Sequence, residues 1–233
     1  MPESVGADLA RVRAEWQSRI GAEYTSAAIA QQVGLWLIQA GAPGELIAAC
    51  LAIVADELEH SRLSHEVYAA AGGTSPPALD RAQLGLPRRF AELERDLLHA
   101  IARVFCFGET VAVPLFAHLR ARCREPVARA ALDRILRDEV RHRDFGWDAL
   151  DYLAGAGVDL HELAGAPLAA MLAELDGSYG RGNPAVAADA GADVSELDRA
   201  WGLAPPAEYA GILARTIDRD FRPRFANRGL ALP

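Results

Sequence analysis

Two copies of one pattern, Asp-Glu-x-x-His, constrain this chain more than any other feature. The first runs from Asp56 to His60 and the second from Asp138 to His142, and the 233 residues contain no other Asp-Glu pair. Residues three apart on an α-helix share one face, so each Glu and its His would point toward one place. In a four-helix bundle, two such pairs and one Glu from each of two further helices form a dinuclear metal site. The side chains that the motifs predict as metal ligands are Glu57, His60, Glu139 and His142.

The two remaining glutamates can be located by counting across turns. In an antiparallel helix pair, residues equidistant from the turn lie at the same level. Counting back from Glu57 across the helix-breaking turn at residues 41–44 reaches Glu23. Counting back from Glu139 across the turn at residues 123–126 reaches Glu109, which lies in an otherwise uncharged run. A lone carboxylate in that run is costly to bury unless it is paired or bound to a metal. Glu23 is less isolated, because Glu15 precedes it on the same helix, but both Glu23 and Glu109 are predicted ligands.

Charge balance favours a metal site over a cluster of carboxylates alone. Four carboxylates at short range repel one another, and without cations several would have to bind protons. Two divalent cations would balance the four charges, and the histidines would add neutral nitrogen ligands. Carboxylates mixed with imidazoles suit iron or manganese, whereas structural zinc sites more often use cysteine. We therefore expect two iron ions, or manganese or a mixed pair. The alternative is two solvated helix faces that carry Glu and His without metal.

The Asp that precedes each Glu is expected to orient a histidine. A metal-bound histidine usually donates its other ring N–H to a carboxylate, which fixes the orientation of the ring. We predict a crossed pairing, Asp56 with His142 and Asp138 with His60. The alternative is that each Asp forms a local ion pair, for example with Arg62.

With these residues in place, the chain resembles the ferritin-like di-iron superfamily, which includes rubrerythrins, bacterioferritins, acyl desaturases and di-iron oxygenases. The resemblance covers roughly residues 10–155 and implies a ferritin-like four-helix bundle that uses O2. No named subfamily matches. Rubrerythrins carry a second Glu where this chain has Ala112, and the N-oxygenases similar to the aminobenzoate enzyme carry a His where it has Ile135.

The expected bundle has four long helices and a crossover between the second and third. Hydrophobic periodicity and turn residues place these helices at residues 8–40, 44–71, 88–122 and 126–154. Pro114 should kink the third helix just beyond Glu109, either as a harmless bend or as a device that widens a pocket.

The remainder of the chain is expected to add helices to this bundle. We predict a four-helix bundle domain over residues 1–155 and a C-terminal helical extension over residues 156–233 that packs on it. The helices of the extension are expected at residues 159–175, 194–202 and 206–220. Residues 176–193, between the first two, should form a loop that is either a lid or binding loop, or a mobile connection or dimer contact.

Composition excludes several other classes of function. All 24 basic residues are arginine, so catalysis through a lysine Schiff base is excluded. No Gly-rich nucleotide fingerprint occurs, so a redox reaction would need an external electron donor. A net charge of −8 argues against nucleic acid as a partner. The apolar runs look too short for a membrane span and the N-terminus lacks a secretory core, so we expect a cytoplasmic protein with no membrane partner.

The resemblance implies a non-haem di-iron oxidase or oxygenase. Its partners would be O2, a small and largely apolar substrate, an external electron donor and, as a possible homodimer, a second copy of the chain. Phe105, four residues before Glu109, is the best candidate for a wall of the substrate pocket, and Tyr24 is a weaker one. The alternatives are a ferritin-like iron-oxidising protein, a rubrerythrin-like peroxide scavenger, and a bundle that has lost its metal.

Overall fold

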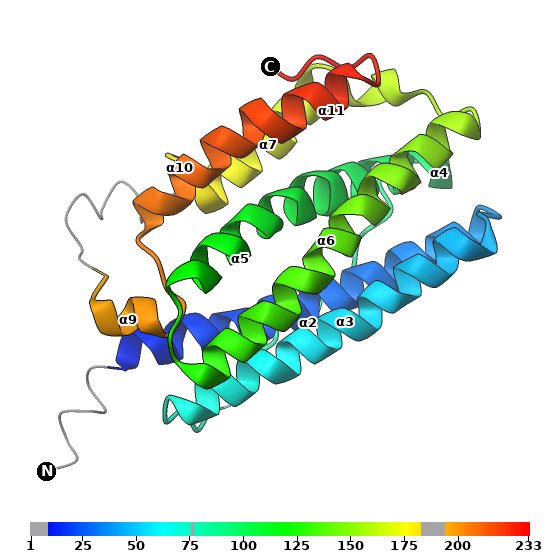
Figure 1. The fold of residues 1–233 in the computed structure, drawn as a ribbon. Helices are drawn as coiled ribbons and strands as arrows, with labels where there is room; N and C mark the ends of the chain where they lie inside the picture. Colours follow the sequence, from blue (N-terminus) through cyan, green and yellow to red (C-terminus); the bar gives the residue numbers. More distant parts are fainter. Residues whose placement is uncertain (1–8, 76, 183–193) are drawn as a thin grey trace, which may run out of the picture. The chain divides into compact units, whose positions relative to one another are not determined.

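The predicted all-α class is confirmed. The computed structural model describes residues 9–75, 77–182 and 194–233, and these residues form an all-helical bundle without a β-strand (Figure 1). The chain divides into two compact units, each assembled from several segments. The first comprises Met1–Pro87, Phe116–Asp138 and Val194–Leu203. The second comprises Arg88–Leu115, Glu139–Asp193 and Ala204–Pro233. The proposed division of the chain at residue 155 stays a prediction.

Two long antiparallel helices, α2 (Ala10–Gln39) and α3 (Gly44–Ala70), form most of the first unit and lie side by side along their length (Figure 1). Gly41 connects them with a φ of +69°, a conformation that favours glycine. Cys50 Sγ donates to the Ala30 carbonyl at 3.3 Å, and Ser61 Oγ donates to the Ile20 carbonyl at 3.0 Å. Both pairs are nearly equidistant from the turn, as the count from Glu57 to Glu23 requires.

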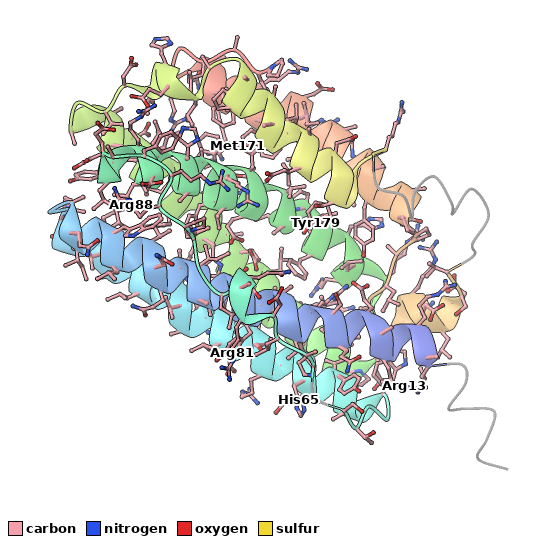
Figure 2. The ribbon with its side chains drawn as sticks, turned by 180° about the vertical axis from the view of Figure 1, so that it is seen from behind. Arg13, His65, Arg81, Arg88, Met171 and Tyr179 are labelled. Carbon is pink, nitrogen blue, oxygen red and sulfur yellow. The ribbon has the colours of Figure 1, made fainter. Side chains whose placement is uncertain are left out.

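The crossover after α3 runs along α2. Gln17 donates to the Ser75 carbonyl at 3.1 Å, and Gln32 Oε1 accepts the N–H of Leu86 at 2.9 Å, so both ends of the crossover are fixed to one helix. Figure 2 shows this segment, with Arg81 labelled in its short 3-10 helix η1 (Arg81–Gln83). The predicted long connection between the second and third helices is therefore present.

The third helical segment is continuous but not uniform. It comprises α4 (Leu93–Ala100), a π-helix η2 (Ile101–Glu109) and α5 (Thr110–Arg122). The prediction that this helix starts at residue 88 was wrong, because α4 begins five residues later, at Leu93. The buried Asp96 carboxylate accepts the N–H groups of Arg89 and Phe90 and pairs with Arg88. These bonds hold residues 88–90 outside the helix, which begins at Leu93.

Length and composition alone would allow Leu93–Arg122 to span a membrane. The expectation that no apolar stretch is long enough was therefore too strong. More than half of the apolar stretch is buried within the protein, as in the core helices of soluble proteins, which pass the same test. The absence of a membrane partner stays a prediction.

The second unit contains the later half of α6 (Pro126–Gly155) and most of the C-terminal helices. An aromatic cluster joins Trp147 of α6 to Phe107 of η2 and Phe225, with ring centroids about 5 Å apart. Arg228 adds a two-pronged ion pair to Asp151. The C-terminal helices of this unit are α7 (Ala166–Tyr179), α10 (Pro206–Thr216), the π-helix η4 (Ile217–Phe221) and α11 (Arg222–Ala226).

The helix predicted at residues 159–175 is interrupted. A 3-10 helix, η3 (Leu160–Leu163), ends before Gly165, whose φ of +71° breaks the helical path. Helix α7 then begins at Ala166 and continues to Tyr179, so the first residues of the predicted loop are helical; Figure 2 labels Met171 and Tyr179 on this helix. Most of that loop, residues 183–193, lies outside the described residues.

A short helix completes the first unit. Helix α9 (Glu196–Ala200) starts with a capping box in which Ser195 and Asp198 bond to each other's backbone N–H groups. Trp16 Nε1 of α2 donates to the Trp201 carbonyl at 3.0 Å. Next to it, Gly202 has a φ of +82°, and a Cβ there would meet a Leu132 methyl at 2.7 Å. Glycine is therefore required where this segment crosses the helices.

Candidate metal centre

Each Asp-Glu-x-x-His motif lies on a helix and turns its Glu and His toward each other. On α3, His60 Nδ1 lies 3.7 Å from Glu57 Oε2. On α6, His142 Nδ1 lies 3.8 Å from Glu139 Oε2. The four side chains are at most 2% exposed. In both motifs, Nδ1 of the histidine faces the carboxylate of the Glu three residues earlier. Nε2 of each ring can therefore make another contact.

The two glutamates found by counting join these pairs. The structure contains two groups of buried side chains whose potential ligand atoms lie within 4.8 Å of one another. One group is Glu23, Glu57, His60 and Glu139, and the other is Glu57, Glu109, Glu139 and His142. Together they contain all six residues that the sequence predicted as ligands. Glu57 and Glu139 belong to both groups, so they are placed to be shared between two ions.

The donor set fits divalent metal ions. The Glu–His distances of 3.7 and 3.8 Å are too long for hydrogen bonds. They do fit two ligands of one ion, because metal–ligand bonds of about 2.0–2.2 Å allow the two ligand atoms to lie up to about 4 Å apart. Oxygen and imidazole nitrogen ligands without thiolate suit iron and manganese. Four buried carboxylates also need positive charge nearby, which two divalent ions would supply.

Asp138 orients the histidine of the other motif. His60 Nε2 lies 3.2 Å from Asp138 Oδ2, and Asp138 is fully buried. The predicted Asp138–His60 contact is therefore present. A carboxylate in this position favours the ring tautomer with its proton on Nε2, in which Nδ1 would be able to bind a metal ion. The other half of the crossed pairing, Asp56 with His142, stays a prediction.

Arg134 is a residue of this site that the sequence reasoning missed. Its guanidinium donates to Asp138 through Nε and to Asp56 Oδ1 through Nη2 at 3.1 Å, so one side chain connects the aspartates of both motifs. The hydrogen bond to Asp138 is the largest cause that raises the pKa of Arg134 above its usual range. A signal was present in the sequence, because Arg134 precedes Asp138 by one helical turn.

Glu109, one of the candidate ligands, lies at the end of a π-helix. Glu109 is the last residue of η2, and the hydrogen-bonding pattern returns to α at Thr110. A Cβ at Gly146 of α6 would meet Phe105 Cβ at 2.6 Å and the Phe105 carbonyl carbon at 2.8 Å, so only glycine permits this approach of α6 to η2. Trp147 Nε1 donates to Thr110 Oγ1 at 3.0 Å and fixes the junction. π-Helical turns within helices are frequent at functional sites.

The two predicted pocket residues have different surroundings. Phe105 is buried, and its ring packs edge-on against Phe145 with centroids 4.9 Å apart. Tyr24 follows Glu23 on α2 and is 40% exposed. Their roles toward a substrate stay predictions.

No protein-family model, no curated protein and no solved structure matches this chain. The candidate metal centre therefore rests on its own geometry: six buried Glu and His side chains that could hold metal ions, two of which belong to both groups, with a buried aspartate next to one histidine.

Proposed function

We propose that this chain is a non-haem di-iron oxidase or oxygenase of the ferritin-like type. It would use O2 to oxidise a small, largely apolar organic substrate in the cytoplasm. The observation that carries this proposal is the pair of buried ligand groups that share Glu57 and Glu139. Two transition ions held by shared carboxylates would suit reactions in which O2 accepts electrons from both.

The grouping of the ligands assigns a role to each one. Glu23 and His60 would hold one ion, and Glu109 and His142 would hold the other. Glu57 and Glu139 belong to both groups and would help to hold both ions. When bound in the ferrous state, the two ions supply the electrons with which O2 is reduced. Asp138 keeps the His60 ring in place, and Arg134 holds Asp138.

The surroundings of the ligands support oxidation of an apolar substrate over simple surface binding of iron. Six of the nine residues of η2 are buried, and Glu109 is the only charged one among these six. Burial excludes water and protects reactive species from side reactions. The chain has no nucleotide fingerprint, so the electrons for further turnovers would come from an external donor.

Oxygen uptake by the iron-loaded protein tests this proposal. The full chain is loaded with ferrous iron without O2, mixed with oxygenated buffer, and followed with an oxygen electrode and by iron spectroscopy. We expect oxidation to stop after about two ferrous ions per chain until a reductant is added. Small apolar substrates should then increase O2 uptake.

Two variants and one contrary result complete this experiment. His142→Ala should abolish the rapid oxidation of the first two ferrous ions per chain. Glu125→Gln, a substitution in the turn before α6, should leave this oxidation unchanged. Continued oxidation of many ferrous ions per chain, without reductant and with formation of large assemblies, would instead identify a ferritin-like iron-handling protein and overturn the oxygenase assignment.

A further inference from the structure

We propose that one face of the α2–α3 hairpin, the hairpin face, binds the same face of a second copy of this chain and so forms a symmetric dimer. The hairpin face belongs entirely to the first unit. It consists of exposed apolar side chains, namely Leu35 and Ile38 of α2 and Ala48, Leu51, Ala55 and Leu58 of α3. None of these residues is a candidate metal ligand, so the proposal does not depend on the di-iron function.

The hairpin is almost free of charge in a strongly charged chain. Residues 24–55 contain a single charged side chain, Glu45, whereas 24% of the whole chain is charged. Glu45 lies in the first turn of α3, where the helix dipole favours a carboxylate. The four large side chains of the hairpin face are between 40% and 52% exposed. Apolar side chains that gather at the surface, with no charge among them, mark an interaction site.

Helix α6 shows what a solvated helix face contains in this protein. It has 30 residues, as α2 does, and its exposed side chains include Asp133, Arg137 and Asp144. In α2, the exposed side chains of Leu35 and Ile38 are apolar, although the inner side of the same helix is apolar as well. A helix that is apolar on all sides is normally buried. The outer side of the hairpin is therefore suited to being covered.

The two helices lie side by side (Figure 1), and their apolar residues adjoin one another. The four α3 residues of the hairpin face follow at intervals of three, four and three, so they form one line along the helix. A Cβ at Gly34 of α2 would lie 3.5 Å from a Leu51 methyl group, and Gly34 precedes Ile38 by one turn. Further along α3, the ion pairs of Arg62 end the apolar surface.

The charge of the chain favours a second copy over a membrane or a charged partner. Helices that lie on membranes carry Lys or Arg beside their apolar face, and anionic lipids attract these residues. Residues 24–55 contain neither, and a net charge of −8 repels an anionic surface. A charged partner would find no opposite charge to recognise. Two copies of the chain repel each other as well, so contact costs least where neither copy carries charge.

The size of the hairpin face suits a weak dimer. The uncharged parts of the two helices are each ~20 Å long, at about 1.5 Å per residue, and together ~20 Å wide. A face of this size buries on the order of 500 Å² from each copy, or roughly 1,000 Å² in total, which is the low end for specific interfaces. A symmetric dimer uses the same patch twice, so one face serves both copies. We expect a Kd of about 1–10 μM.

Sedimentation velocity of the full chain tests the dimer. We expect a monomer of 25.0 kDa at the lowest concentration and a particle of twice that mass at the highest. The double variant L35E/L51E places like charges in both faces and should weaken the dimer by at least about 100-fold, with the helical circular dichroism unchanged. Leu197→Glu is the matched control, because Leu197 of α9 lies in the same unit and is 40% exposed, as Leu51 is. This variant should dimerise like the wild type.

Opposite charges distinguish a broken interface from a misfolded chain. L35E/L51E and L35K/L51K should each be monomeric, and an equal mixture of the two at low salt should dimerise, because the same face of each copy meets the other. A wild type that stays monomeric to about 200 μM, a dimer that L35E/L51E leaves intact, or a mixture that stays monomeric would each overturn the proposal. A monomer that floats with phosphatidylcholine vesicles would assign the hairpin face to a membrane and would overturn it as well.

Discussion

The candidate metal centre and the surface ion pairs both bring charged groups together, but in opposite environments. The candidate ligands include four carboxylates that are at most 8% exposed, whereas the side chains of the pairs Arg103–Glu174 and Arg120–Asp133 are at least 40% exposed. Water and salt can screen the charges of these surface pairs. They cannot screen buried carboxylates, which require cations or protons. A cluster in the core is therefore stronger evidence for a bound ion than an exposed one, and its perturbation should have larger effects.

The largest effect is expected for the two shared carboxylates. Glu57→Gln should abolish binding of both ions, because Glu57 belongs to both ligand groups, whereas Glu23→Gln should leave one ion per chain. We expect the apparent iron affinity of Glu57→Gln to fall by more than about 100-fold, beyond the about 10–100-fold that loss of an outer partner costs. Anaerobic titration with ferrous iron measures both quantities. Equal losses in the two variants would contradict the shared role.

Glu109→Ala is expected to have a smaller effect, on two quantities: the Tm of the metal-free protein and the rise in Tm that iron causes. Removing one of four buried carboxylates relieves repulsion and desolvation in the metal-free protein, so its Tm should rise or stay unchanged. The rise in Tm on adding ferrous iron without O2 should shrink, since that rise reflects binding to the native state alone. Differential scanning calorimetry with and without iron measures both. Glu125→Ala in the turn before α6 is the control and should change neither value.

The opposite result would reassign this residue. If Glu109→Ala strongly destabilises the metal-free protein and the iron-induced shift persists, Glu109 is a structural pairing residue, and the ligand of the third helical segment lies elsewhere.

A moderate effect is expected at Asp138, which contacts His60 and belongs to neither group of candidate ligands. Asp138→Asn keeps the size of the side chain and removes the charge that holds His60. Iron affinity should fall by about 10–100-fold, with the helical circular dichroism unchanged. Asp133→Asn, on the same helix and paired with Arg120 at the surface, is the matched control. Wild-type iron affinity in Asp138→Asn would reduce Asp138 to a structural acid.

The smallest effect is expected from salt. Raising the ionic strength from about 0.05 to 0.5 M should leave iron binding within about twofold of its original affinity, since buried charges are screened much less than exposed ion pairs. Titrations at two salt concentrations measure this, and a several-fold loss of iron affinity would contradict a buried site.

Much of the metal centre could be predicted because it depends on helix geometry. The i, i+3 spacing holds in any α-helix, so His60 and His142 face their glutamates as the motif requires. Counting across a turn works because α2 and α3 stay in register, as the Ala30–Cys50 bond shows. Both rules are local and need no knowledge of the remaining fold.

The features that were missed depend on contacts between segments distant in the sequence. The π-helix before Thr110 fits a surface that α6 provides at Gly146, and no local pattern signals that fit. The late start of α4 follows from the bonds of Asp96 to residues before the helix. Arg134 alone had a local signal, one turn before Asp138.

The metal content of the protein tests the central claim most directly. The full chain, freed of metal with a chelator and reconstituted with ferrous iron without O2, is desalted and analysed by plasma mass spectrometry. We predict about two iron ions per chain, with X-ray absorption showing about one histidine nitrogen per ion. A protein that retains no iron, or that binds iron with the same stoichiometry after both His60 and His142 are replaced by Ala, would contradict the assignment of this site.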